Sequence, residues 1–236
     1  MVRMMRRIQF APVLFCILLL LSSCSINGSS SAEKYFEEGE FEFVGPLFAG
    51  NRIVPDSLSE LEQYYCFGFD DNPDDSVVIG RCKVAGPGIN RIIEPSIEEM
   101  DYSKTYGENH VLTPIILSEI YYAGNKVDIK PNEEAYLIEP YFYITESAKD
   151  YYKAFGGGKI YTYEYTPLKK DVEYIIYMRL REDAVYDYND AVILDLCGRQ
   201  EAVYCIGDEE KAKQVVRSDD NSYWNKWKEV IRKYVK

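Results

Sequence analysis

The sequence predicts a mainly β body, with short helices near its ends and an amphipathic helix at the C-terminus. Residues 172–180 show the clearest period of two in the chain, which is typical of a half-buried strand. Other β-rich runs are separated by turns that contain glycine or proline. Near the C-terminus, four large side chains recur at spacings of three and four residues and so share one helix face. They are Trp224, Trp227, Ile231 and Tyr234.

Local patterns predict the elements in the first two thirds of the chain. Ser57 is followed three residues later by Glu60, which resembles a capping box and predicts a short helix over 58–65. Pro114 is expected to mark an edge or a bulge in its strand, and Pro140 to interrupt another. Strands are expected over 76–84, 110–122, 135–144 and 160–165.

The last third is expected to hold a hairpin and two helices. Segments 191–196 and 202–206 flank Gly198-Arg199, which predicts the hairpin, and 208–216 predicts a short helix. Asp220 or Asn221 can cap the final helix. Its aromatic face is expected to cover one end of a sheet, with docking to a partner or a membrane as the alternative. Cations lie toward its C-terminal end, where the helix dipole favours them: Lys226, Lys228, Arg232, Lys233 and Lys236.

Charge and composition exclude some classes of function. The chain of 236 residues has 27 basic and 39 acidic residues, a formal net charge of −12. This argues against nucleic acid as a partner, because phosphate binding needs a basic face. A single histidine excludes histidine-rich metal or catalytic clusters. We expect no cofactor.

The N-terminus has the pattern of an export signal. A positive segment with Arg3, Arg6 and Arg7 precedes an apolar run over 10–21 that is too short to span a bilayer comfortably. The run ends in Leu21-Ser22-Ser23-Cys24, which resembles the bacterial lipobox. The resemblance implies cleavage before Cys24, a lipid (diacylglycerol) on its sulfur and usually a fatty acyl chain, such as palmitate, on its new amino group. An ordinary signal peptide cut after Ser23 is the alternative.

The expected organisation is therefore a signal peptide over 1–23, a lipidated cysteine with a flexible tether over 24–33, and one extracytoplasmic domain over 34–236. Removal of the signal peptide takes away three arginines and no acid, so the net charge changes from −12 to −15. An anionic membrane repels such a body, and the lipid must hold it. By the lipoprotein sorting pattern, Ser25 favours the outer membrane in a two-membrane cell. In a one-membrane cell the body would face outward from the cell membrane.

The order of motifs in the body resembles netrin-like modules and tissue inhibitors of metalloproteinases, and also a class of lipoproteins of unknown role from Gram-positive bacteria. The match spans about residues 57–207. It implies a five-stranded, partly open antiparallel barrel of the OB type. The motifs that carry it are Asp75-Ser76-Val77-Val78-Ile79-Gly80-Arg81, Ser118-Glu119-Ile120-Tyr121, Tyr136-Leu137-Ile138-Glu139 and the Pro167–Tyr177 run.

The inhibitory mechanism of those families does not carry over. In them a free N-terminal cysteine chelates the protease zinc beside the first strand. Here Cys24 would be thioether-linked, and it lies some fifty residues before Ser76. The disulfides of those modules do not map onto this chain either. The resemblance therefore implies a fold and does not imply an activity.

Four cysteines remain in the body and allow three pairings, which an extracytoplasmic location permits. Sequence proximity favours Cys66–Cys82 together with Cys197–Cys205. Buried free thiols are the alternative. The spacing of the four does not fit a zinc site.

Other residues carry weaker signals of chemistry. His110 has no G-x-S-x-G partner motif for a catalytic triad. Asp70, Asn72 and Asp74 match the first positions of a calcium-binding loop. Asp75 and Arg81 occupy the positions where an EF-hand needs Gly and Glu, so the pattern excludes an EF-hand. A less regular Ca²⁺ site is the alternative. The acid pairs Glu98-Glu99 and Glu133-Glu134 could suggest a glycoside hydrolase if carboxylates converge across a cleft.

Tyrosine accounts for 22 residues, and exposed tyrosines could stack on sugars or bind a protein. Tyr161, Tyr163 and Tyr165 would share one strand face and are the candidate ligand-binding residues, with half-buried strand positions as the alternative. The sequence thus predicts a lipid-anchored, non-catalytic module that binds an envelope protein or glycan. The alternatives are a cell-envelope hydrolase that uses paired carboxylates and a structural envelope spacer.

Overall fold

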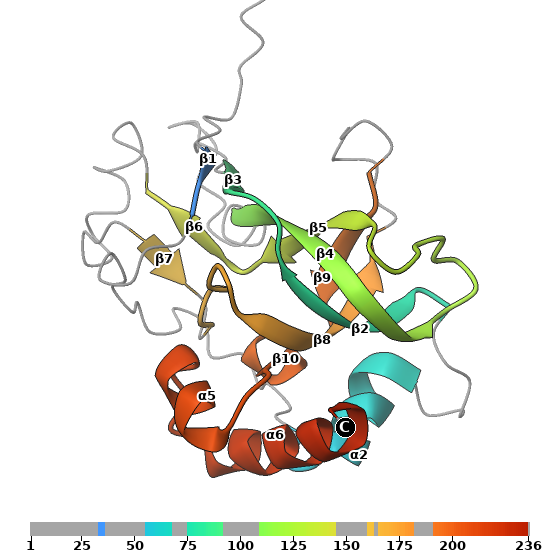
Figure 1. Ribbon diagram of the computed structural model, residues 1–236, viewed down its shortest axis with the longest axis vertical. Coiled ribbons are helices and arrows are strands. Elements are labelled where there is room, and N and C mark those ends of the chain that lie inside the picture. The colour runs from blue at the N-terminus through green and yellow to red at the C-terminus, as the bar shows by residue number, and fades with distance from the viewer. Residues whose placement is uncertain are drawn as a thin grey trace, which may run out of the picture.

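The computed structural model describes residues 33–35, 55–67, 75–91, 109–144, 160–162, 165–181 and 191–235. The described elements form a barrel of strands with a layer of helices at one side (Figure 1). In chain order they are β1 (Glu33–Lys34), α2 (Leu58–Leu61), the π-helical turn η1 (Glu62–Phe67), β2 (Val77–Val84), β3 (Gly88–Arg91), β4 (His110–Ala123), β5 (Glu134–Glu139), β6 (Tyr141–Tyr143), β7 (Ile160–Thr162), β8 (Glu173–Leu180), β9 (Ile193–Leu196), the 3₁₀ turn η3 (Gln200–Ala202), β10 (Val203–Cys205), α5 (Glu209–Val215) and α6 (Asn221–Tyr234).

Strands β2, β4, β5, β8 and β9 close into a barrel. β2 pairs with both β4 and β8, β8 pairs with β9, β9 pairs with β5, and β5 returns to β4. In chain order, the first of these strands therefore pairs with the second and the fourth, and the third pairs with the fifth. This confirms the OB-like fold. The barrel is closed and mixed rather than partly open and antiparallel, because the β5–β9 pair is parallel.

Alternation along each strand separates the barrel interior from its outer wall. On β2, Val78, Gly80 and Cys82 face inward with Tyr174, Ile176 and Met178 of β8, their register partners. Gly80 is required by a close approach: a Cβ there would lie 2.6 Å from Leu117 Cδ2 and 3.0 Å from the Glu119 carbonyl oxygen. The inward residues belong to one continuous apolar core.

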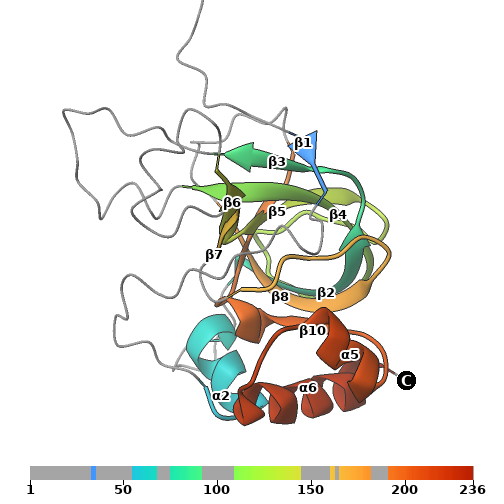
Figure 2. The same cartoon turned by 90° about the vertical axis from the view of Figure 1, so that its left-hand side faces the viewer.

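The helices cover the outer wall of β8 and β10. Figure 2 shows α2, α5 and α6 together on one side of the barrel. Tyr204 of β10 stacks on Tyr223 of α6, with ring centroids 5.6 Å apart, and Tyr177 of β8 packs edge-on against Tyr204. Tyr223, Trp224, Trp227 and Val230 are the buried apolar residues of α6. The expectation that this helix covers a sheet is confirmed.

The predicted caps are present. Ser57 Oγ accepts a hydrogen bond from the Glu60 amide at 3.2 Å, and Asp56 N donates to Glu60 Oε2 at 2.8 Å. The short helix continues as η1 instead of ending at residue 65. The Asp220 side chain caps α6 as expected, and Asp208, which was not predicted as a cap, caps α5. These side chains accept hydrogen bonds from the backbone N–H groups of the first turn, which have no partner within the helix, and so stabilise the helix starts.

One expectation about the last third is wrong, and one buried cation was not anticipated. Segments β9 and β10 form no hairpin with each other, because both pair antiparallel with β8 at successive positions. Lys226, one of the cations noted in this helix, is not exposed to solvent. Its ammonium group is buried and donates to the Pro55 carbonyl and to Ser222 Oγ, and burial lowers its pKa.

Pro114 lies in a central strand, where a missing N–H would ordinarily break a ladder. Its carbonyl accepts from Ala85 N at 2.8 Å, in the corner where β2 ends and β3 begins. The neighbouring ladder of β4 passes from β3 at Leu112 to β2 at Ile115, so the proline falls in the gap between two partners. Pro114 therefore marks the point where β4 changes its pairing partner from β3 to β2, and it does not mark an edge strand.

Neither expected disulfide is present, and all four body cysteines are buried free thiols. Cys82 faces the barrel interior, whereas Cys66 lies in η1 on the outer wall. Cys197 N donates to the Tyr177 carbonyl, whereas Cys205 pairs with Tyr174, three residues earlier on β8. That separation is roughly 10 Å, which exceeds the Cα distance of about 4.4–6.8 Å that a disulfide needs.

Candidate functional site

A buried carboxylate, Glu139, lies at one end of the barrel. It is fully buried and accepts three hydrogen bonds. Thr113 Oγ1 donates to one of its oxygens, and Tyr165 Oη and the Leu168 amide each donate to the other at 2.8 Å. Three donors compensate much of the cost of burying a charged group.

The fold explains why Glu139 points inward. On β5, Glu139 lies on the same face as Leu137 and Ala135, and these three pair with the inward-facing Val111, Thr113 and Ile115 of β4. Glu139 is the last residue of β5, so its side chain enters the barrel at the end where β5 stops. It therefore meets whatever chain crosses that end.

The 165–170 segment crosses this end and is held there by side chains from three directions. Besides the two bonds to Glu139, Thr166 N donates to Gln200 Oε1 at 2.7 Å and Lys169 N donates to Tyr174 Oη at 2.8 Å. Within this segment, the side chains of Tyr165 and Leu168 are buried. Glu139 is thus a fastening point for the segment that closes the barrel end.

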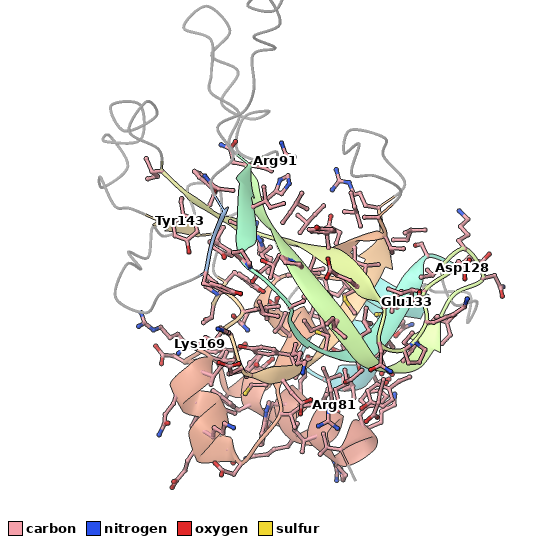
Figure 3. The ribbon with its side chains drawn as sticks, turned by 45° about the horizontal axis from the view of Figure 1, so that its top comes forward. Arg81, Arg91, Asp128, Glu133, Tyr143 and Lys169 are labelled. Atoms are coloured by element: carbon pink, nitrogen blue, oxygen red, sulfur yellow. The ribbon has the colours of Figure 1, made fainter. Side chains whose placement is uncertain are left out.

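A second polar layer lies beside Glu139 on β3 and β6. Asn90 of β3 donates through Nδ2 to the Tyr143 carbonyl and accepts from Tyr143 N, both at 2.8 Å. The side-chain amide thus reproduces a backbone ladder between β3 and β6. Figure 3 places Tyr143 and Lys169 on one side of the molecule and Glu133 on the other.

The electrostatics of this end are set by burial. Burial raises the pKa of Glu139 to about 7, although the bonds from Thr113, Leu168 and Tyr165 lower it. Burial, and then the charge of Glu139, raises the pKa of Tyr141 and Tyr165 well above 10. The carboxyl group of Glu139 therefore changes charge near neutral pH while the surrounding hydroxyls stay neutral. The strength with which it holds the 165–170 segment should consequently depend on pH.

The proposed tyrosine face is wrong for Tyr165. That residue is only 2% exposed, and its hydroxyl binds Glu139, so no ligand can stack on it. Tyr161 lies on β7 opposite Phe142, and Tyr163 falls outside the described residues. The strand expected over 160–165 is present as β7 over Ile160–Thr162, and Tyr165 lies after it and is buried.

The remaining candidates are scattered. His110 is buried at the first position of β4, opposite Arg91. Glu133 and Glu134 are exposed neighbours, and Glu133 accepts from Lys130 N at 2.9 Å. Cys24, Asp70, Asn72, Asp74 and the Glu98-Glu99 pair fall outside the described residues. Within the described ranges, no group of three or more His, Cys, Asp or Glu side chains could hold a metal ion.

A small apolar cluster lies on the outer wall of the barrel, separate from the main core. We call it the outer cluster. Tyr136 and Ile89 are half-exposed and pack on its buried members, which face outward because they alternate with the inward residues of their strands. The buried members are Leu112, Ile138 and Ile193.

The sequence analysis did not single out Glu139 or the outer cluster. One signal was present for Glu139: it is the only acid in the otherwise apolar and aromatic run Ala135–Tyr143. An acid in such a run must be buried with partners or must end the strand. No comparable signal marks the outer cluster, because its members come from four strands.

No model of a known family matches the chain, and no curated protein matches it in sequence. In the part of the chain that the structure describes, no helix is both long enough and apolar enough to cross a membrane.

Proposed function

We propose that this protein is a lipid-anchored, non-catalytic module that stands outside the cytoplasm and binds a protein or a glycan of the cell envelope. The observation that carries the proposal is the Leu21-Ser22-Ser23-Cys24 lipobox directly after an apolar run. A lipidated Cys24 would fix the chain to the membrane surface. Two or three acyl chains give stable anchoring, whereas one chain is marginal.

The outer cluster supports the binding role. It lies on the wall formed by β4 and β5, which are the second and third strands of the barrel. OB barrels commonly bind ligands on this face. Tyr136 offers an aromatic ring with a polar tip, which suits contact with a sugar or a peptide. The acidic balance of 27 basic against 39 acidic residues disfavours nucleic acid here.

Lipidation is tested by replacing the candidate cysteine in the cell. Cys24→Ser should abolish incorporation of labelled palmitate. Cys16→Ser is the matched control, because Cys16 lies in the apolar run and leaves with the signal peptide. An unmodified Cys24 in the wild-type protein by mass spectrometry would refute the anchor.

Binding is tested with immobilised protein and two probes, purified peptidoglycan and detergent-solubilised envelope proteins. Tyr136→Ala should weaken retention of the bound probe at least tenfold. Tyr64→Ala is the control, because Tyr64 is 42% exposed on η1, in the helix layer. Circular dichroism checks that both variants fold. Equal retention by both variants would remove the outer cluster from the proposal.

A further inference from the structure

Two of the buried cysteines contact each other. The Cys66 thiol hydrogen-bonds with the Cys197 thiol, although the two residues are about 130 positions apart. Cys66 lies in η1 and is fully buried, and Cys197 directly follows β9 and is 4% exposed. The contact therefore joins the helix layer to the end of a barrel strand.

Backbone bonds hold both cysteines in place. Cys197 N donates to the Tyr177 carbonyl of β8 at 2.9 Å. The neighbour of Cys66, Tyr65, accepts through its carbonyl from Arg179 Nη2 of β8 at 2.8 Å. The backbone of Cys197 and the residue before Cys66 are thus both bonded to β8, at Tyr177 and Arg179, which are two residues apart. Disulfides form where the fold already brings two cysteines together in this way.

We propose that Cys66 and Cys197 form a disulfide that links η1 to the end of β9 in the exported protein. The two thiols lose two protons and two electrons as the S–S bond forms. A disulfide oxidant of the glutathione type takes up the electrons and protons, and its own S–S bond breaks to give two thiols. The oxidising compartment rests on the proposed extracytoplasmic location.

The pairing excludes the other two cysteines. Cys82 and Cys205 each pair in register with Tyr174, from opposite sides of β8, and so are separated by two strand spacings of roughly 4.8 Å each. Their side chains belong to the core on the barrel side of the sheet. They should stay as free thiols in the folded protein.

The time of formation follows from the surroundings of Cys66. The bond from Cys197, burial and the charge of Glu62 all raise the pKa of the Cys66 thiol. A raised pKa leaves little thiolate, which is the reactive form. The bond should therefore form during folding, before η1 closes over the barrel wall.

The test is oxidative refolding of the full-length chain carrying Cys16→Ser and Cys24→Ser, in mild detergent with reduced and oxidised glutathione. Peptide mapping without reduction should find Cys66 linked to Cys197. The oxidised protein should melt about 10 °C above the reduced protein, because the bond closes a long loop. Cys66→Ser and Cys197→Ser should each abolish this difference, and Cys82→Ser and Cys205→Ser should preserve it.

Linkage of Cys66 to Cys82, linkage of Cys197 to Cys205, or four titratable thiols after refolding would each overturn the pairing. A second measurement separates the pairing from the location. Protein trapped with N-ethylmaleimide in envelope fractions should carry the same linkage. Reduced thiols there, with the linkage formed in vitro, would refute the oxidising location and uphold the pairing.

Discussion

At the scale of single residues, Glu139 shows how a β-barrel can hold a buried acid. Its three donors come from β4, from a tyrosine side chain and from a backbone amide of the 165–170 segment. Those bonds favour the charged form, but burial outweighs them and the pKa rises to about 7. The residue therefore makes the stability of the barrel end sensitive to pH.

The sign of this dependence follows from linkage. The folded pKa is about 7 and the ordinary value is 4.5, so the folded state binds the Glu139 proton more tightly than the unfolded state. The contribution to stability is fully present below pH 4.5, falls as the pH rises through 7, and is constant above. We expect a loss of about 3 kcal/mol in unfolding free energy across this range.

Glu139→Gln should remove that slope. The amide carries no charge, its oxygen can accept from Tyr165 and Leu168, and its nitrogen can donate to Thr113 Oγ1. Urea unfolding at a series of pH values measures the effect. Glu134→Gln, an exposed position on the same strand, should keep the wild-type slope. A slope that survives in Glu139→Gln would contradict the assignment.

At the scale of elements, the free edge of β10 explains the position of α6. β10 pairs with β8, and its carbonyls at Val203 and Cys205 accept from Tyr223 Oη and Trp227 Nε1, both at 2.8 Å. These donors are four residues apart on α6 and so lie one turn from each other. The helix covers an edge that would otherwise offer unpaired backbone groups.

Removal of the hydroxyl group should change the free energy of unfolding differently for the stacked tyrosines Tyr223 and Tyr204. Tyr223→Phe leaves the buried Val203 carbonyl without its donor and should cost about 1–2 kcal/mol. The Tyr204 hydroxyl is buried and has no hydrogen-bond partner among the described residues. Tyr204→Phe should therefore be neutral or stabilising. Chemical denaturation of both variants measures this, and equal losses would show that Tyr204 has a partner.

At the scale of the whole molecule, the barrel and the helix layer share one core. β8 has residues of both faces in that core: Tyr174 and Ile176 toward the barrel, and Ile175 and Tyr177 toward the helices. Neither layer can separate without exposing the other face of β8 to water. The body should consequently unfold as one cooperative unit.

The two tryptophans of the chain test this cooperativity. Both lie on α6, so tryptophan fluorescence reports on the helix layer alone. Amide hydrogen exchange of β2 and β4 reports on the barrel. The two probes should give the same unfolding free energy in urea within error. A lower value from fluorescence would show that the helices detach first and would argue against a single domain.

The sequence predicted the strands better than their partners. The alternation over 172–180 and the β-rich run over 110–122 identified β8 and β4, and the predicted caps identified the starts of α2 and α6. These patterns are local. The hairpin of β9 and β10 was wrong because a turn signal does not reveal that β8 is the common partner of both.

The candidate site was harder to predict. Tyr165 looked like a surface residue because tyrosine suits half-exposed strand positions. Its burial depends on the 165–170 segment crossing the barrel end above Glu139, a contact 26 residues away in sequence. The cysteine pairing failed for the same reason, since sequence proximity does not measure distance across a barrel wall.

By itself, the sequence determined the mainly β class, the capped helices and the acidic charge of the chain, because each of these depends on residues within a few positions of each other or on composition alone. The closure of the barrel, the inward direction of Glu139 and the contact of Cys66 with Cys197 were decided only by the tertiary structure. Each of these requires segments that are distant in the chain to meet, and the pairing of strands around the barrel, not any local pattern, determines which ones do.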